Sequence, residues 1–373
     1  MKNMKGFLFP ILSGANSMTL IRRIIMPLLL ITAAACTQEQ EIVLADFRDV
    51  DVSYISPVDS VNLEGYGIFM PEYIIKHQDK YVIKKFDKEN LIDVLDKNTG
   101  EILKIAKKGR ALNEYISIGS LQYVNGYLYV YDVSLQKYNT YSIDSLLING
   151  GEPLKVNQYQ YKETPLGYME KPFKIYRNNN NFITIGLWEN DSWYRLMTKD
   201  GRFSAGVERV TFEGLESMTE IEKATLHLSS CISIKPSGDK VVCALCNAPA
   251  ISVSNILKDK LVEKKRIVYD SPKVDQVNQK GMPLLQYDGS NLKSFCNIYA
   301  SDSLIYALYS GRRMDSKVPS YQCNHLLIYD WELKPIKRYE LNNSINSFCI
   351  EGDTLYGVSS YPEGRLYVYR LDS

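Results

Sequence analysis

The chain repeats one short pattern of polar and apolar residues along most of its length. A turn built from Gly, Asn, Asp or Ser is followed each time by a run in which apolar residues alternate with smaller or polar ones, as in a β-strand. The six copies are QDKYVIKKFD (78–87), VNGYLYVYD (124–132), NNNFITIGL (179–187), SGDKVVCAL (237–245), SDSLIYALY (301–309) and EGDTLYGVS (351–359). Their turns are about 46 to 63 residues apart, which matches one four-stranded propeller blade with loops of variable length.

Each copy has strand-like segments on both sides, so we expect it to be the second strand of a blade. The sequence therefore predicts an all-β fold: a six-bladed β-propeller of four-stranded antiparallel blades, closed by N- and C-terminal strands that share a blade. The last copy is followed by only one more strand before Ser373, so we expect the segment near Val52–Ser56 to complete this blade. Two stacked β-sandwiches are the alternative, but they do not predict a repeat of this length.

One segment departs from the strand pattern. In residues 213–229, EGLESMTEIEKATLHLS, apolar residues recur every three or four positions at Leu215, Met218, Ile221, Ala224 and Leu228. This spacing predicts a short helix that caps the ring, contacts a partner or packs on its own domain.

The N-terminal segment has the three regions of a secretory signal. Two arginines precede IIMPLLLITAAA (24–35), an apolar run too short to span a bilayer, and Cys36 follows directly. The AAAC sequence resembles a bacterial lipobox, with Ala33 where Leu is usual, so Cys36 is the expected lipidation site. We expect a lipoprotein signal peptide at 1–35, with Met18 as an alternative start, a lipid-anchored linker at 36–50 and the propeller at 51–373.

Composition limits the partners of the chain. Forty-four Lys and Arg residues balance forty-three Asp and Glu residues, so no net field attracts nucleic acid, and contact with a membrane is expected through the lipid on Cys36 alone. The TQEQE sequence after Cys36 resembles the acidic stretch that directs Bacteroidetes lipoproteins to the cell surface. We expect an outer-membrane lipoprotein, exposed at the cell surface or otherwise on the periplasmic face.

The repeats and the signal together resemble the TolB-like six-bladed propeller lipoproteins of Bacteroidetes, from about Val52 to the end. That family has a GxGPGEY-like turn after the first blade, and KKGRALNEY (107–115) stands in its place. Gly109, Glu114 and Tyr115 fit, whereas Leu112 and Asn113 replace the Gly-Pro pair. The resemblance implies a secreted propeller without an assigned biochemical role.

No residue pattern predicts a cofactor, a metal site or a catalytic set. Cys243 and Cys246 form a CxxC sequence, but positions three apart on a strand point to opposite faces, and only Cys231 and His227 lie near enough in sequence to add ligands. Six further cysteines remain beside Cys36, and we expect them to be small buried residues. Asn and Asp residues in the turns suit a calcium site and tight turns equally, and the sequence does not separate the two.

Loops between the second and third strands, and between blades, should gather on one face of a propeller. Candidate ligand-binding residues on that face are Arg110, Tyr115, Trp188, Trp193, Arg312, Arg313 and Tyr361. Aromatic rings beside guanidinium groups suit a sugar, a peptide or an acidic group. We therefore expect this face to bind a protein or glycan partner, without catalysis. The alternatives are a lyase or lactonase acting on a polysaccharide or small ester, and an accessory subunit of an outer-membrane nutrient-uptake complex.

Overall fold

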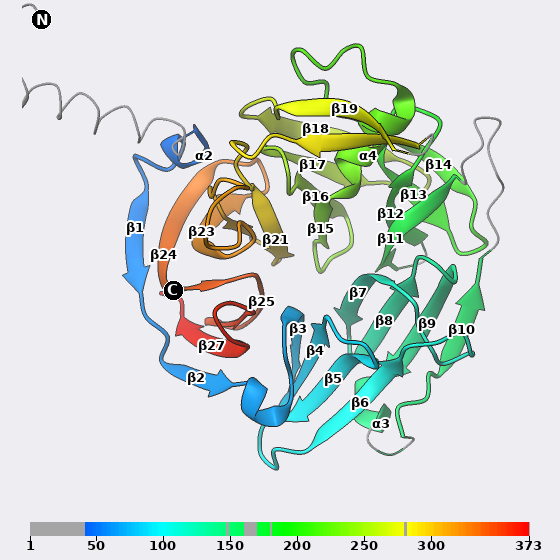
Figure 1. Cartoon of the computed structure of the whole chain (residues 1–373), viewed down its shortest axis with the longest axis vertical. Coiled ribbons are helices and arrows are strands. Elements are labelled where there is room, and N and C mark those ends of the chain that lie inside the picture. Colours follow the sequence, from blue (N-terminus) through cyan, green and yellow to red (C-terminus); the bar gives the residue numbers. More distant parts are fainter. Residues whose placement is uncertain are drawn as a thin grey trace, which may run out of the picture. The chain divides into compact units, whose positions relative to one another are not determined.

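The computed structural model describes residues 42–372, except 147, 149, 160–169, 180, 280 and 281. The proposed signal peptide, Cys36 and most of the proposed linker lie outside the described residues. Among the residues that are described, no helix is long and apolar enough to cross a membrane. Six sheets are arranged in a ring around a central channel (Figure 1), so the predicted all-β, six-bladed propeller is confirmed.

In each blade, strands that follow one another in the chain pair antiparallel and are ordered from the channel outward, and N-terminal strands are added to the last two blades. Blade 1 contains β3 (Pro71–His77), β4 (Lys80–Lys85), β5 (Asn90–Asp96) and β6 (Ile102–Lys107). Blade 2 contains β7 (Ile118–Val124), β8 (Tyr127–Asp132), β9 (Lys137–Ser142) and β10 (Lys155–Gln158), with the short helix α3 (Ile143–Leu146) after β9. Blade 3 contains β11 (Lys171–Asn178), β12 (Asn181–Leu187), β13 (Ser192–Thr198) and β14 (Phe203–Glu208).

The second half of the ring carries two additions to this plan. Helix α4 (Glu220–Leu228) leads into blade 4, which contains β15 (Ser230–Ile234), β16 (Lys240–Leu245), β17 (Ala250–Ile256) and β18 (Leu261–Val268). A separate hairpin, β19 (Val274–Gln279) and β20 (Met282–Tyr287), precedes blade 5, which contains β21 (Phe295–Ala300), β22 (Leu304–Tyr309), β23 (Cys323–Asp330) and β24 (Pro335–Ile345). Blade 6 contains β25 (Ser347–Glu351), β26 (Thr354–Ser359) and β27 (Arg365–Arg370). All six sequence copies are second strands, as predicted.

The N-terminal strands close the ring, but with different residues from those predicted. Strand β2 (Asp59–Asn62) pairs antiparallel with β27 and is the fourth strand of blade 6. The predicted segment near Val52 instead forms β1 (Asp51–Ile55), which pairs in parallel with β24 as a fifth strand of blade 5. In Figure 1 the blue strands β1 and β2 lie beside the orange β24 and the red β27.

The position of β1 follows from the segment that precedes it. Helix α2 (Ile42–Ala45) brings Val43 and then Phe47 into the core between blades 4 and 5, where both are fully buried. The Phe47 ring contacts the ring of Tyr329 edge-on, with 5.0 Å between centroids. Residues 43–50, expected to be linker, are therefore packed, and they deliver the chain to the outer edge of blade 5 before it reaches blade 6.

The hydrophobic core is divided into six layers, each between two neighbouring blades. Strand β8 shows how the sequence builds them. Leu128 and Val130 pack toward blade 1, whereas Tyr129 and Tyr131 point to the other side and pack toward blade 3. Because the second strand of a blade is buried on both faces, its residues can be apolar at every position. The alternation along β8 is therefore between large and smaller apolar residues, and not between apolar and polar residues.

Ring closure by β2 leads to a first prediction. A variant that lacks residues 1–62 loses β1 and β2 and leaves the edges of β24 and β27 unpaired. We expect its free energy of unfolding in urea to be several kcal/mol lower than that of a control that lacks residues 1–41, and its solubility to fall. Equal stability of the two truncated chains would show that β1 and β2 are not needed to close the ring.

Candidate functional site

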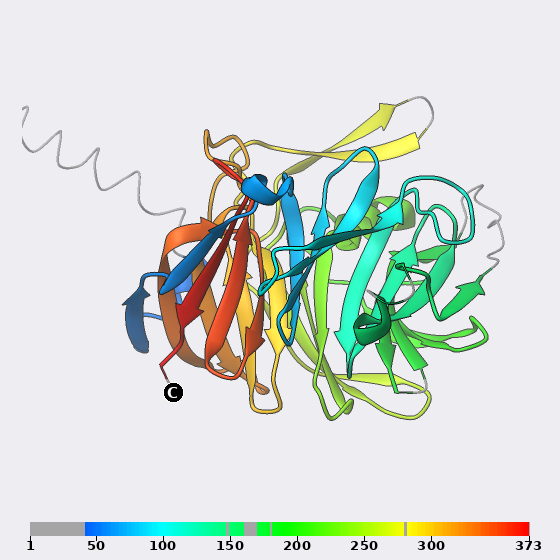
Figure 2. The same cartoon turned by 90° about the horizontal axis from the view of Figure 1, so that it is seen from below.

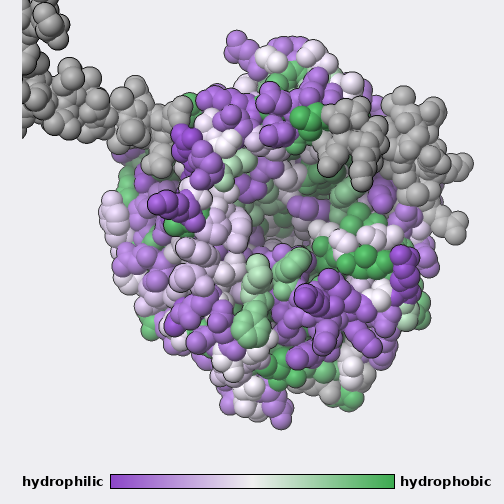
Figure 3. Space-filling model, in the orientation of Figure 1, coloured by the Kyte–Doolittle hydropathy of each residue, from purple (hydrophilic) through white to green (hydrophobic). Residues whose placement is uncertain are grey.

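Two kinds of connection meet on one face of the ring, which we call the loop face. Because successive strands of a blade run in opposite directions, loops between the second and third strands end on the same side as the connections between blades. Among the described residues, the loop face comprises 63–70, 86–89, 108–117, 133–136, 188–191, 209–229, 246–249, 269–279, 282–294, 310–322, 346 and 360–364. It lies at the top of Figure 2, where the β19–β20 hairpin stands above the ring, and it faces the viewer in Figure 3.

Three of the predicted ligand-binding residues do not reach the surface of this face. Tyr115, Trp188 and Trp193 are all fully buried. The indole nitrogen of Trp193 donates to the Ser230 hydroxyl over 2.9 Å, and the Arg195 guanidinium lies 5.3 Å from the Trp188 ring. The expectation that these rings are available to a ligand is wrong, because they are part of the packing between strands and loops.

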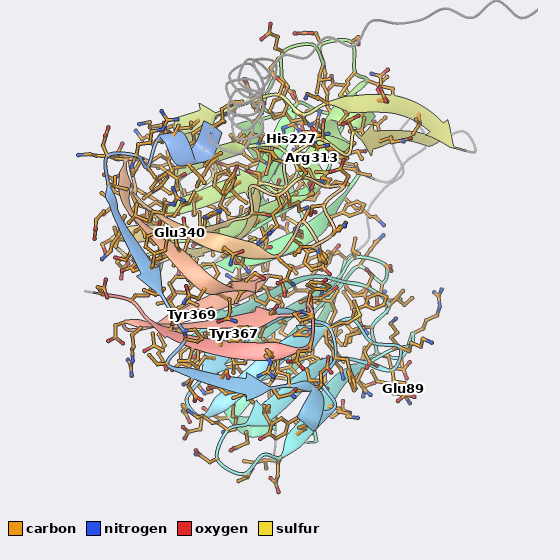
Figure 4. The ribbon with its side chains drawn as sticks, turned by 60° about the vertical axis from the view of Figure 1, so that its left-hand side comes forward. Glu89, His227, Arg313, Glu340, Tyr367 and Tyr369 are labelled. Atoms are coloured by element: carbon orange, nitrogen blue, oxygen red, sulfur yellow. The ribbon has the colours of Figure 1, made fainter. Side chains whose placement is uncertain are left out.

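Helix α4 is the reason that Trp193 is covered. The predicted helix is present as residues 220–228, begins with a capping box between Thr219 and Glu222, and packs on β12, β13 and β20 of its own chain. His227, near its end, is buried against the Trp193 ring, with 5.6 Å between ring centroids. Figure 4 shows His227 within the body of the fold, whereas Glu89, in the 86–89 loop, lies at its periphery.

His227 is held as a neutral imidazole by two backbone groups. The amide of Val210 donates to Nε2 over 3.0 Å, so the proton lies on Nδ1, which donates to the carbonyl of Lys223 over 2.7 Å. Burial lowers the pKa of His227 to about 3. A second proton on Nε2 would face the Val210 amide, which is itself a donor, so His227 is a fixed structural group and not a proton carrier near neutral pH.

The turn at residues 107–115 is held from inside by one lysine. The Lys137 ammonium, which is almost fully buried, donates to the carbonyls of Ala111 and Leu112, each over 2.9 Å, and to the carbonyl of Glu114. It also lies 4.7 Å from the centre of the Tyr115 ring. A charged donor that satisfies three carbonyls fixes the path of the turn.

The residues of this turn that fit the GxGPGEY-like pattern have structural roles. A Cβ atom on Gly109 would lie 1.8 Å from a carboxylate oxygen of Glu114, and that carboxylate accepts a hydrogen bond from the Ala111 amide over 3.0 Å. The Tyr115 hydroxyl contacts the Tyr141 hydroxyl at 2.5 Å inside the core. The two residues that depart from the pattern, Leu112 and Asn113, are exposed. The residues that fit the pattern therefore stabilise the turn itself, through contacts within the turn and with the core.

The two arginines of the 310–322 loop are engaged within the loop. Arg312 donates through Nε to the Gln322 carbonyl over 2.9 Å and also contacts the Asn324 side chain. Arg313 is exposed, but its guanidinium makes two bonds of 2.9 and 2.8 Å to the Asp315 carboxylate. Arg312 is thus a structural residue, and Arg313 reaches solvent as part of an ion pair. A role for either in binding stays a prediction.

Four exposed apolar side chains occur on one part of the loop face, and the sequence analysis singled out only one of them, Tyr361. Phe69, Met70, Phe86 and Tyr361 have exposed fractions of 53%, 49%, 63% and 41%, and we call them the apolar rim. The Phe86 amide donates to the Met70 carbonyl over 3.1 Å, and the Gly364 amide donates to the Glu64 carboxylate over 2.9 Å, which brings these loops together over blades 1 and 6. Figure 3 shows apolar side chains among polar ones beside the central hollow of this face.

Positive charge accompanies the apolar rim. The Lys108 ammonium lies 5.9 Å from the centre of the Phe86 ring, and Arg110, in the same loop, is exposed. Of the seven predicted residues, Arg110, Arg313 and Tyr361 are thus exposed on the loop face. Only Tyr361 belongs to the apolar rim. The sequence offered a signal for two other residues of the rim, because Phe69 lies two residues before β3 and Phe86 directly follows β4, both at the loop-face ends of these strands.

Below this face, the channel narrows to a cavity of about 160 Å³ lined by the first strands of the blades. Its wall carries Glu72 paired with Lys84, together with Lys174, Tyr73, Asn297 and Cys231. Burial raises the pKa of Tyr73, so its hydroxyl stays protonated. Among the described residues, no group of three or more His, Cys, Asp or Glu side chains is arranged to hold a metal ion.

The TolB-like six-blade propeller model matches residues 97–353, more than half of the chain. The chain belongs to this TolB-like family. A DUF4221 protein from Bacteroides vulgatus has a similar fold, with a TM-score of 0.53 at 10% identity over 85% of this chain and 97% of that one. A Bacteroides fragilis protein whose name describes it as exported gives 0.48 at 11% identity over 86% and 100%. No protein with a curated description matches the sequence.

In this TolB-like chain, the three hydrogen bonds from Lys137 to the turn at residues 107–115 predict that Lys137 contributes to the stability of the fold. Replacing Lys137 with Met keeps the aliphatic stem but leaves the three carbonyls of the turn without the buried ammonium group that they bind, so we expect the free energy of unfolding to fall by about 1 to 3 kcal/mol. The control is Lys97→Met, because Lys97 is exposed on the β5–β6 turn. Urea denaturation measures both. If Lys137→Met lowers the free energy of unfolding no more than Lys97→Met does, Lys137 does not stabilise the turn.

The buried His227 predicts a dependence of stability on pH. The unfolded chain binds a proton with the ordinary pKa of 6.5, whereas the folded chain binds it only near pH 3. Unfolding therefore takes up a proton throughout this window, and stability is lost as pH falls through it. We expect about 2 kcal/mol to be lost from this group between pH 7 and pH 5. In His227→Asn, which is less stable at pH 7, that part of the slope should be absent from urea denaturation curves.

Proposed function

We propose that the chain is an exported, lipid-anchored propeller that binds a protein or glycan partner through its loop face. The observation that carries this proposal is the apolar rim, in which Phe69, Met70, Phe86 and Tyr361 expose large apolar side chains on the loop face over blades 1 and 6. Large apolar side chains that are exposed together lower the solubility of a protein, and such patches commonly mark interaction sites. A partner that covers them would gain the free energy of removing them from water.

The chemistry of the rim supports two classes of partner. The Phe69, Phe86 and Tyr361 rings offer flat surfaces on which the apolar face of a sugar ring can stack, and the same rings are typical anchors of protein interfaces. Lys108 adds positive charge beside the Phe86 ring, and Arg110 is exposed in the same loop as Lys108, which suits a partner with carboxylate groups. The alternative of a lyase or lactonase gains no specific support from the described residues.

Export and the lipid anchor are supported by the sequence pattern. Arg22 and Arg23, the apolar run at 24–35 and Cys36 have the order and spacing of a lipoprotein signal. A chain anchored through Cys36 would have few residues between the lipid and Val43, where packing into the propeller begins. The propeller would then be held close to the membrane on which the protein is anchored, at the cell surface or on the periplasmic side.

A rim variant tests the proposal. Phe69→Ser with Phe86→Ser removes both aromatic rings, and Leu257→Ser with Ile336→Ser is the matched control, because Leu257 and Ile336 are also exposed, at 43% each, but lie on other parts of the blades. The measurement is the affinity of the purified chain for surface glycans and for outer-membrane proteins of its source cell. We expect the rim variant to lose at least about tenfold in affinity, or 1.4 kcal/mol, for the class that binds.

The control also separates binding from folding. Both double variants expose less apolar surface than the parent chain and should keep its thermal midpoint within a few degrees. A rim variant that binds as tightly as the control to an identified glycan or protein would exclude the apolar rim as the binding surface.

A further inference from the structure

The cavity below the loop face carries polar groups that the propeller itself does not pair. Among the described residues, five of the six first strands, β3, β7, β11, β15 and β21, contribute to its wall, and all of their lining residues except Tyr176 lie within the first four residues of the strand. First strands begin at the loop face, so the cavity lies at that end of the channel, where Figure 3 shows a central hollow. We therefore expect a small molecule to enter it from the loop face.

β-Bulges shape this end of the channel. The register of four first strands shifts close to the loop face, at Glu72 in β3, Gly119 in β7, Phe173 in β11 and Cys296 in β21. A bulge adds a residue to one strand and changes the direction of the side chains beside it. A Cβ atom on Gly119 would lie 2.0 Å from the Phe173 carbonyl oxygen, so these two bulges fit together only with glycine at residue 119. Lys174 directly follows the bulge at Phe173, which therefore determines where the lysine side chain leaves the strand.

Lys174 brings an ammonium group to the cavity without a carboxylate partner. Its Nζ donates to the Ser230 carbonyl over 2.5 Å, and among the described residues no Asp or Glu side chain is paired with it. An ammonium group has three donors, so two remain for a ligand. The other two charged residues of the described wall, Glu72 and Lys84, form an ion pair with each other. The wall therefore has one net positive charge, which a monoanion neutralises, whereas a dianion would leave a charge uncompensated in a confined space.

Two tyrosine hydroxyls line the same cavity and are free to donate. Tyr73 comes from blade 1 and Tyr176 from blade 3, both are half-buried, and neither hydroxyl has a hydrogen-bond partner within the part of the chain that the structure describes. Burial raises the pKa of both tyrosines, so each hydroxyl keeps its proton near neutral pH. The Ser120 hydroxyl and the Asn297 amide of the same wall differ, because both already donate to neighbouring strands. The two phenols are thus available to a ligand oxygen.

The size of the cavity limits the ligand. Its volume of about 160 Å³ is well above the roughly 15 Å³ that one water molecule needs and below the roughly 300 Å³ at which sites for drug-sized molecules begin. In a cavity this small, groups on opposite walls can contact one ligand at the same time. The ligand is therefore a small organic molecule and not a segment of a polymer.

We propose that the cavity binds a small organic monocarboxylate, whose oxygen atoms lie beside the Lys174 ammonium and accept hydrogen bonds from the hydroxyls of Tyr73 and Tyr176. Hydrogen bonds to a charged acceptor are stronger than those between neutral groups, so the carboxylate uses all three donors better than a neutral ligand does. The site shares no residue with the apolar rim. The inference therefore goes beyond the function proposed above and does not depend on it.

The test is a calorimetric titration of the full chain at pH 7 with acetate, lactate and gluconate, each compared with its neutral amide. The amides have nearly the same shape as the acids but carry no charge. We expect at least one of the three carboxylates to bind, and to bind at least about tenfold more tightly than its amide. Inorganic phosphate, which is largely a dianion at this pH, should bind more weakly than that carboxylate. In Lys174→Met the preference for the acid over its amide should be lost.

A phenylalanine variant tests the tyrosines without removing their rings. Tyr73→Phe with Tyr176→Phe deletes two hydroxyl groups that make no bond within the described chain, so the fold should be kept, and we expect the affinity for the carboxylate to fall at least about fivefold. The matched control is Tyr54→Phe with Tyr127→Phe, because these tyrosines are exposed outside the cavity, and its affinity should equal that of the parent chain.

Three results would overturn the proposal, and the first two need only the unaltered chain. They are no binding of any of the three carboxylates, equal binding of acid and amide or tighter binding of phosphate, and an affinity of the Tyr73→Phe, Tyr176→Phe variant equal to that of its control. Each of them leaves the partner proposed for the apolar rim unaffected.

Discussion

The four residue pairs between β2 and β27 are the constraint on which the rest of the fold depends. A propeller blade buries both faces against its neighbours, so a ring with one blade missing its outer strand leaves a hydrogen-bonding edge and a weakened core layer at the same place. With the ring closed, the six first strands are held around one channel, and the loops of all blades are fixed on one face. The cavity and the apolar rim are positioned by this closure.

The fold could be predicted because its signal is repeated and local. Alternation of large and small apolar residues marked each second strand, and those strands are buried on both sides, where sequence is restricted most. The closing strand could not be located in the same way. Strand β2 reads DSVN and carries no apolar alternation, whereas Val52 and Tyr54 of β1 do alternate with polar residues and were the better match. Only the packing of Phe47 shows which edge the chain reaches first.

The site was less predictable, because exposure of a loop residue is decided by segments distant in sequence. Trp193 is the second residue of β13 and follows a polar loop, and it is buried because α4, an insertion between blades 3 and 4, covers it. Tyr115 has the surroundings of an exposed turn in sequence, yet Lys137 and Tyr141 from the next blade enclose it. Phe69 and Phe86 show the converse: Phe69 lies just before β3 and Phe86 directly after β4, so each reads as part of a buried strand in the sequence, yet both side chains are exposed. Charge pairing within a loop, as between Arg313 and Asp315, also leaves no mark in sequence.

The parallel pairing of β1 with β24 has a mechanical consequence. A pull on the N-terminal end of the described chain reaches Phe47 first, and the edge-on contact of its ring with Tyr329 resists withdrawal from the core. Beyond it, tension runs lengthwise along β1, whose bonds to β24 are aligned side by side and must yield together, in shear, before any load arrives at β2. Blade 5, which binds β1, therefore carries the tension first. The pairing of β2 with β27 that closes the ring is not loaded until β1 has separated from β24.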